Sequence, residues 1–152
     1  MTSVRLAKSD DLAGLLDLYI DLHSADEPLP AQSILDKVWS DILSNPWQHV
    51  FLAERDGQLV SSCVLQVVPN LTRGARPYGL IENVVTRRDK RGQGFGSQVL
   101  KAALELAWEK KCYKVMLLTG RKDTEVFRFY EKAGFKAGVK TGFVAMAPGK
   151  QR

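Results

Sequence analysis

Hydrophobic residues in the first third of the chain recur every three to four positions, a spacing typical of amphipathic helices. A short alternating run, "VRLA" at residues 4–7, predicts a strand before them. Ser9 or Asp10 can cap the first helix, and the two prolines of "SADEPLPAQ" end it. A second helix is expected over residues 31–43. The apolar stripes are Leu12, Leu15, Leu16, Tyr19 and Ile20, then Ile34, Leu35, Val38 and Ile42.

Strand patterns fill the middle of the chain. Residues 49–69, "HVFLAERDGQLVSSCVLQVVP", place β-rich runs on both sides of Asp56-Gly57, a dipeptide typical of hairpin turns. "NLTRGARP", residues 70–77, is expected to be a loop because turn residues dominate it. "YGLIENVVT", residues 78–86, predicts a further strand.

The C-terminal half alternates between helix and strand patterns. A helix is expected over about residues 94–110, a buried strand in 113–120 and a short helix within 123–134. "FKAGVKTGFVAM", residues 135–146, predicts a closing pair of strands. The full order predicts an α/β (α+β) three-layer sandwich, with a mixed, mostly antiparallel central sheet flanked by helices. We expect residues 1–152 to form a single domain.

Composition adds a broad class and the charge of a partner. An apolar fraction of 45% and a charged fraction of 26% are ordinary for a soluble globular protein. No apolar run approaches the roughly 18 residues of a membrane helix, and the N-terminus lacks an apolar secretory segment. We therefore expect a cytoplasmic protein that does not bind membranes. The net charge of +5 favours an anionic partner, such as a phosphorylated cofactor.

Cysteine and histidine do not indicate a metal site. Cys63 and Cys112 lie far apart in apolar runs, as expected of reduced and packed thiols. His23 and His49 have no neighbouring cluster of Cys or Asp ligands. We expect no bound metal.

The segment "RGQGFG", Arg91 to Gly96, carries the most specific chemistry. Its glycines follow a strand and precede a helix, so backbone N–H groups can converge on an anion. The helix N-terminus adds about half a positive charge. The spacing differs from the dinucleotide fingerprint, and no lysine follows Gly96 as a P-loop requires. A tight structural turn is the remaining alternative.

The same hexapeptide resembles R-x-x-G-x-G, the pyrophosphate signature of the GNAT superfamily of acyl-CoA-dependent N-acyltransferases. The resemblance covers essentially the whole chain and is strongest over residues 78–135. Within the superfamily, "IENVV", "RGQGFG", "CYKVMLL" and "FYEKAGF" together are most similar to glucosamine-6-phosphate N-acetyltransferases. The N-terminal half gives no comparable support for that substrate. The resemblance implies a GNAT fold, acetyl-CoA as co-substrate and no metal.

The resemblance also implies which residues bind the co-substrate. The strand before the loop is expected to bulge and to splay from the next strand, so that the pantetheine arm pairs with its free edge. The side chain of Arg91 can assist the loop amides at the pyrophosphate. Arg87, Arg88, Lys90 and Lys132 either meet the 3′-phosphate or form a solvated basic face. The expected binding residues are Val84, Val85 and Thr86 on the strand, then Arg91, Gly92, Gln93, Gly94, Phe95, Gly96 and Ser97 in the loop.

Two residues are candidates for proton transfer. Tyr130 in "FYEKAGF" matches the family tyrosine whose hydroxyl can protonate the leaving CoA thiolate. Glu82 can deprotonate the substrate ammonium, directly or through water, or bind that cation, or form a structural salt bridge. Strict alternation places Glu82 and Val84 on one face of the strand and Ile81 and Asn83 on the other.

The amine is expected between the first two helices and the central strands. Arg73 and Arg76 could clamp a carboxylate or phosphate of the substrate, and His23 could be a second base. Asn83 departs from the acidic residue expected in the glucosamine-6-phosphate enzymes. The candidate substrate residues are Tyr19, His23, Arg73, Arg76 and Asn83.

These observations predict an N-acetyltransferase that moves an acetyl group to a primary amine of a small molecule, by direct attack in a ternary complex. The amine would be an amino sugar, an amino acid or a related compound. The alternatives are acetylation of a protein N-terminus or lysine, and acyl-CoA binding without turnover. Nucleic-acid binding is not expected, since the basic residues lack interleaved aromatics. A homodimer is expected from the family.

Overall fold

The computed structural model describes residues 1–149. Within this part, the chain forms two compact units, the first of residues 1–117 and the second beginning at residue 118. Among the described residues, the first unit contains the five strands of a single sheet, and the second contains one helix. The single domain expected for residues 1–152 stays a prediction.

The sheet follows the order of the chain, β1-β2-β3-β4-β5. The first four strands are antiparallel to their neighbours, and β5 is parallel to β4. The predicted mixed, mostly antiparallel sheet is therefore confirmed. The strands are β1 Thr2–Leu6, β2 Gln48–Arg55, β3 Gln58–Val68, β4 Tyr78–Thr86 and β5 Val115–Leu117.

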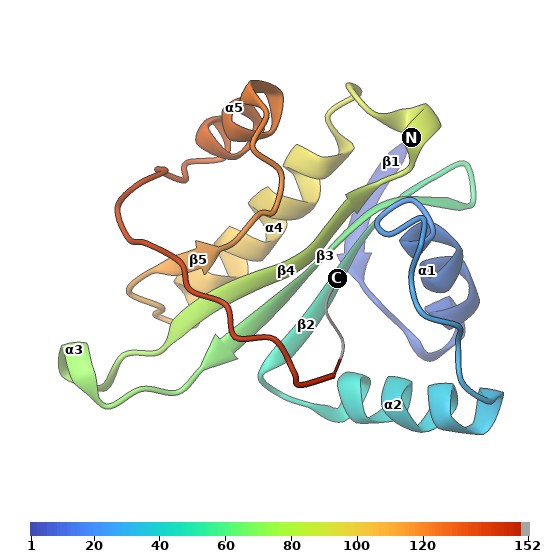
Figure 1. The fold of residues 1–152 in the computed structure, drawn as a ribbon, viewed down its shortest axis with the longest axis horizontal. Coiled ribbons are helices and arrows are strands. Elements are labelled where there is room, and N and C mark those ends of the chain that lie inside the picture. Colours follow the sequence, from blue (N-terminus) through green and yellow to red (C-terminus); the bar gives the residue numbers. More distant parts are fainter. Residues whose placement is uncertain (150–152) are drawn as a thin grey trace. The chain divides into compact units, whose positions relative to one another are not determined.

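Helices flank this sheet on both faces within the first unit (Figure 1). Two of them, α1 and α2, cover one face, and α4 packs on the other. The second unit contributes α5. The α-helices are α1 Leu12–Tyr19, α2 Gln32–Ser44, α3 Thr72–Ala75, α4 Phe95–Glu109 and α5 Thr124–Lys132, and the 3-10 helices are η1 Ser9–Asp11 and η2 Arg88–Lys90.

The core of the first unit lies on both sides of β2, β3 and β4. On one face, apolar side chains of α1 and α2 meet alternate residues of the strands. On the other, α4 buries residues three to four apart, and its alanines allow close approach to the sheet. The first cluster is Leu15, Leu18, Trp39, Val50, Leu52, Val64 and Val85, and α4 contributes Phe95, Val99, Leu100, Ala103 and Ala107.

The predicted hairpin turn is confirmed. Asp56 and Gly57 both have positive φ, 52° and 74°, and they join β2 to β3 directly. Two positive φ angles match the right-handed twist of the flanking strands, so Asp-Gly is favoured there. Both cysteines are free and buried, and burial raises the pKa of the Cys63 thiol to about 12.

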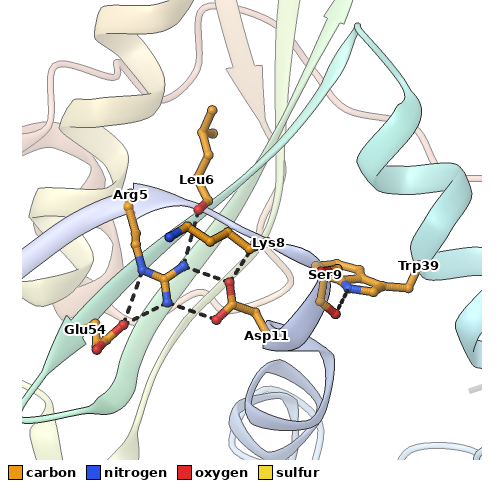
Figure 2. Close-up of polar contacts among 7 residues, drawn as sticks. All are labelled: Arg5, Leu6, Lys8, Ser9, Asp11, Trp39 and Glu54. Atoms are coloured by element: carbon orange, nitrogen blue, oxygen red, sulfur yellow. Dashed lines mark hydrogen bonds and ion pairs between the residues drawn. The ribbon is translucent and has the colours of Figure 1, made fainter.

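The start of the first helix differs from expectation (Figure 2). Neither Ser9 nor Asp10 caps it; instead the 3-10 helix η1 precedes α1, and Asp11 accepts the Lys8 N–H at 2.7 Å. Arg5 fixes the same carboxylate with two hydrogen bonds, of 2.7 and 2.9 Å. It also donates to Glu54 at 2.8 Å, so one guanidinium joins β1, β2 and the entry to α1.

The closing pair of strands predicted over residues 135–146 is wrong. Within the described part of the second unit, α5 is followed by turns and irregular chain. The apolar residues of this segment are present, but most of them are exposed; Phe143, for example, is 90% exposed. A two-stranded pair is marginal alone, and Gly138 and Gly142 weaken this one further. The strand expected in 113–120 is also shorter, limited to β5, and half-buried.

Candidate active site

A β-bulge in β4 determines where its side chains point. Ser62 of β3 lies opposite Val85 and Val64 lies opposite Glu82, so Asn83 and Val84 together face one residue of β3. Asn83 has a φ of 52°, which a regular strand residue does not adopt. The bulge expected from the family resemblance is therefore present.

The bulge overturns the strict alternation predicted for this strand. Glu82 lies opposite Val64, whose side chain belongs to the cluster beneath α1 and α2. Asn83 was expected on the opposite face, yet its side chain bonds to Tyr19 of α1. One inserted residue moves everything after it to the other face. The polar groups of β4 therefore gather under α1.

Beyond the bulge, one edge of β4 is open. The strand β5 pairs with β4 only over Gly79–Ile81, and residues 82–86 continue without a β5 partner. The Arg87 N–H donates to Val60 O across β3 at 2.9 Å. Since backbone groups alternate along an antiparallel strand, those of Thr86 and Val84 point to the open edge. Val85 points the other way, and its carbonyl accepts from the buried Ser61 hydroxyl at 2.8 Å.

The glycine loop presents a row of N–H groups, which we call the loop amides: those of Arg91 through Ser97. Those of Phe95, Gly96 and Ser97, in the first turn of α4, donate no hydrogen bond to another group among residues 1–149. The first helical bond of α4 starts one residue later, from Gln98 N–H to Gly94 O at 3.1 Å. The loop amides thus combine a helix N-terminus with the turn before it.

Two glycines of the loop are required by backbone conformation. Gly92 has a φ of 76°, and Gly94, at the N-cap of α4, has a φ of 86°. A Cβ at either position would meet no other atom within 4 Å, so the positive φ, and not crowding, is what favours glycine there. The loop is fixed from below by Phe95, which is buried to 2% exposure.

The basic residues before the loop are largely engaged within the protein. Arg87 lies 3.6 Å from Asp17 and 3.2 Å from Asp89. The guanidinium of Arg91 donates to Thr86 O and to Asp21 O, both at 3.3 Å. Arg91 therefore braces the loop from the side of β4 and α1.

Glu82 and Tyr19 lie on the same side of the sheet but differ in exposure and in their polar contacts. Glu82 is exposed, and no ion pair or hydrogen bond joins its side chain to another residue in the described part of the chain. The structural salt bridge considered for it is therefore absent there. Tyr19 is half-buried, and burial raises the pKa of its hydroxyl, an effect that the bond to Asn83 partly offsets. The fold thus brings two of the predicted substrate residues, Tyr19 and Asn83, into contact under α1.

Arg73 and Arg76 belong to a different group of side chains, the Tyr113 cluster. Their guanidinium carbons lie 5.9 and 5.8 Å from the centre of the Tyr113 ring, and Lys114 Nζ lies 5.3 Å from it. None of the three cations pairs with a carboxylate within residues 1–149. His23, exposed beyond the end of α1, is not part of this cluster.

Tyr130 lies in the second unit, on α5. Asp123 caps this helix, since its carboxylate accepts the Val126 N–H at 3.0 Å. The Tyr130 ring is half-buried and contacts Phe129 and Phe135, with ring centres 4.9 and 6.2 Å away. These contacts hold the ring of the candidate acid within its own unit.

Several residues near the loop escaped the sequence prediction. Asp17 and Asp21 stand four positions apart and both contact the basic run, a spacing that puts them on one side of a helical turn. Ser61 and Lys114 carried no comparable signal, because a strand serine and a surface lysine are common. Across residues 1–149, no helix is long and apolar enough to cross a bilayer.

Comparison with known proteins agrees with this architecture. Residues 13–135 match the model of the acetyltransferase (GNAT) family. The chain is 40% identical over 134 residues to glucosamine 6-phosphate N-acetyltransferase of Trypanosoma brucei brucei, covering 88% of each protein. A protein of Agrobacterium tumefaciens str. C58, assigned as an acetyltransferase, superposes with a TM-score of 0.89 at 46% identity, over 95% of this chain and 99% of that one.

A more distant likeness extends to a structure that contains the co-substrate. A predicted acetyltransferase of Clostridium acetobutylicum, solved with acetyl-CoA, has a TM-score of 0.74 at 19% identity, over 95% of this chain and 96% of that one. At that identity the likeness concerns the fold alone. The family match covers most of the chain, including nearly all of the first unit and residues 118–135 of the second. The chain belongs to the acetyltransferase (GNAT) family, and it is an acetyl-CoA-dependent N-acetyltransferase.

Proposed function

We propose that the protein transfers an acetyl group from acetyl-CoA to the primary amine of a small anionic molecule, with glucosamine 6-phosphate as the first candidate. The observation that carries the proposal is the row of loop amides beside the open edge of β4. A diphosphate requires several N–H donors in close succession, and those of Phe95, Gly96 and Ser97 have no other partner in the described chain.

The open edge of β4 suits the pantetheine arm. An extended chain of amides can pair with the backbone groups of Val84 and Thr86, as an added strand would. The Thr86 carbonyl already accepts from Arg91, so Val84 is the residue whose backbone is fully available. The N–H of Val84, beside the bulge, is also proposed to stabilise negative charge on the thioester oxygen.

Glu82 is the proposed proton acceptor for the amine. An amine must lose its proton before it can attack a thioester, and a carboxylate can take that proton directly or through water. The side chain is exposed, faces α1 and has no competing partner within residues 1–149. Tyr130 is the proposed acid for the thiolate, and this assignment rests on the family resemblance.

The Tyr113 cluster is the proposed binding site for the anionic group of the amine substrate. Three cations around one aromatic ring repel each other unless an anion joins them. Guanidinium groups bind phosphate or carboxylate oxygens in pairs. The Trypanosoma relative acts, by its name, on a phosphorylated amino sugar, which is such an anionic amine.

The test is thiol release from acetyl-CoA with a panel of amines. We expect glucosamine 6-phosphate to be acetylated with a higher kcat/KM than glucosamine, and Arg73→Ala with Arg76→Ala to remove that preference. Lys37→Ala, on the exposed face of α2, is the matched control. Release with peptides only would assign a protein substrate instead. Tight CoA binding without release for any amine would identify a regulator.

A further inference from the structure

The short helix η2, Arg88–Lys90, leads directly into the loop amides but cannot cap itself. Its N-cap position is occupied by Arg87, whose side chain has no acceptor for a helix N–H. The Arg88 N–H is nevertheless bonded: it donates to Asp21 Oδ2 at 2.9 Å. The acceptor comes from the turn that follows α1, 67 residues earlier in the chain.

The same aspartate holds the loop at a second point. Its backbone carbonyl accepts from the Arg91 guanidinium at 3.3 Å. Arg88 is the first residue of η2, and Arg91 follows its last residue. Asp21 therefore contacts both ends of this helix. On the opposite side, the Arg87 N–H is bonded to Val60 O of β3 at 2.9 Å. The segment before the loop amides is thus clamped between β3 and α1.

We infer that Asp21 is a positioning residue for acyl-CoA binding, and this inference rests on the proposed function. The loop amides can converge on a diphosphate only if the segment that leads into them is ordered. A ligand that meets an already ordered loop loses less conformational entropy on binding. Asp21 supplies that order by giving η2 the cap that its own sequence lacks.

The negative charge of Asp21 and its role as a helix cap have opposite expected effects on the affinity for CoA, which makes the inference testable. A carboxylate near an anion site repels the anion, so loss of its charge alone should tighten CoA binding. Loss of the acceptor should weaken binding, since the end of η2 becomes uncapped. Asp21→Asn removes the charge but keeps an acceptor oxygen, whereas Asp21→Ala removes both.

The experiment is titration of the whole protein with CoA by calorimetry, without turnover. We expect Asp21→Ala to raise Kd about five-fold, as for loss of a helix cap, and Asp21→Asn to stay within about two-fold of the wild type. Asp41→Ala is the matched control, because Asp41 forms an ordinary exposed ion pair on α2. Amide hydrogen exchange of residues 88–97 in the unliganded protein should rise in Asp21→Ala only.

The outcomes separate this inference from the proposed function. A wild-type protein that does not bind CoA would contradict the proposed function itself. Normal wild-type binding with an unchanged Kd in Asp21→Ala would overturn the inference, and so would equal tightening in both Asp21 variants. Circular dichroism checks that Asp21→Ala is folded, and the exchange rates outside residues 88–97 report any general loosening.

Discussion

Glu82 and Asn83 are neighbours in the sequence, but the bulge gives them different surroundings. Asn83 is bonded to Tyr19, whereas Glu82 has no partner within residues 1–149. An exposed carboxylate without a cation nearby is available to accept a proton or to bind an ammonium group. For Glu82 and Tyr130, a single substitution that removes only the ionisable group can test the proposed role in proton transfer.

Glu82→Gln should change the pH dependence of the reaction. The amide keeps the size and the acceptor oxygen but cannot take a proton, so the amine must lose its proton to the solvent. We therefore expect a lower kcat and a shift of the acidic limb of the kcat/KM profile to higher pH. Initial rates between pH 5 and 10 provide the measurement. An unaltered acidic limb would show that another group, or water alone, accepts the proton.

Tyr130→Phe should lower kcat by roughly ten-fold or more if the hydroxyl protonates the thiolate. The ring contacts with Phe129 and Phe135 do not need the hydroxyl, so the variant should fold normally. The KM for acetyl-CoA is the internal control and should change little. Equal kcat in the two proteins would remove Tyr130 from the mechanism.

At the scale of elements, the sequence predicted most of the fold. The hairpin, the strand over residues 78–86 and the two long helices lie within about one or two residues of expectation, since periodicity reports local structure well. The hydrophobic pattern alone could not predict the bulge. Val84 and Val85 are both apolar, so either one can face the core. The bond from Asp21 to Arg88 was also invisible, because it joins distant segments.

Gly94→Ala tests whether the loop needs its left-handed residue. A Cβ there meets no atom, so the cost is conformational, about 1 kcal/mol at a positive φ. Gly57→Ala in the hairpin turn carries the same penalty at a position outside the loop amides, which makes it a matched control. We expect urea unfolding to show similar destabilisation of both variants. Only Gly94→Ala should weaken CoA binding, and equal Kd values would argue against the loop as the pyrophosphate site.

At the scale of the molecule, the stability of the first unit depends on a network centred on Arg5. The guanidinium beside Asp11 holds the pKa of that carboxyl below its usual range, and the Lys8 N–H adds to the effect. A lowered folded pKa contributes stability that is complete above the unfolded value, near ~3.9, and is lost as pH falls through the folded value. The network should therefore weaken in acid.

Asp11→Asn should lower the free energy of unfolding by about 2 kcal/mol at pH 7, because two charge-assisted hydrogen bonds lose their charge. The difference from wild type should persist at pH 5 and shrink below about pH 4, where the wild-type carboxyl also becomes protonated. Urea unfolding at pH 7, 5 and 3 measures it. A difference that stays constant to pH 3 would contradict the ionic origin.

The loop amides have one more consequence. Backbone N–H groups have no proton to lose in the working range of an enzyme, whereas lysine and histidine do. A diphosphate held mainly by amides should thus be bound equally well at neutral and alkaline pH. The amine substrate becomes a better nucleophile as the solution turns alkaline. Because binding of the co-substrate would not weaken as the amine becomes more reactive, the rate should rise with pH at constant KM for acetyl-CoA.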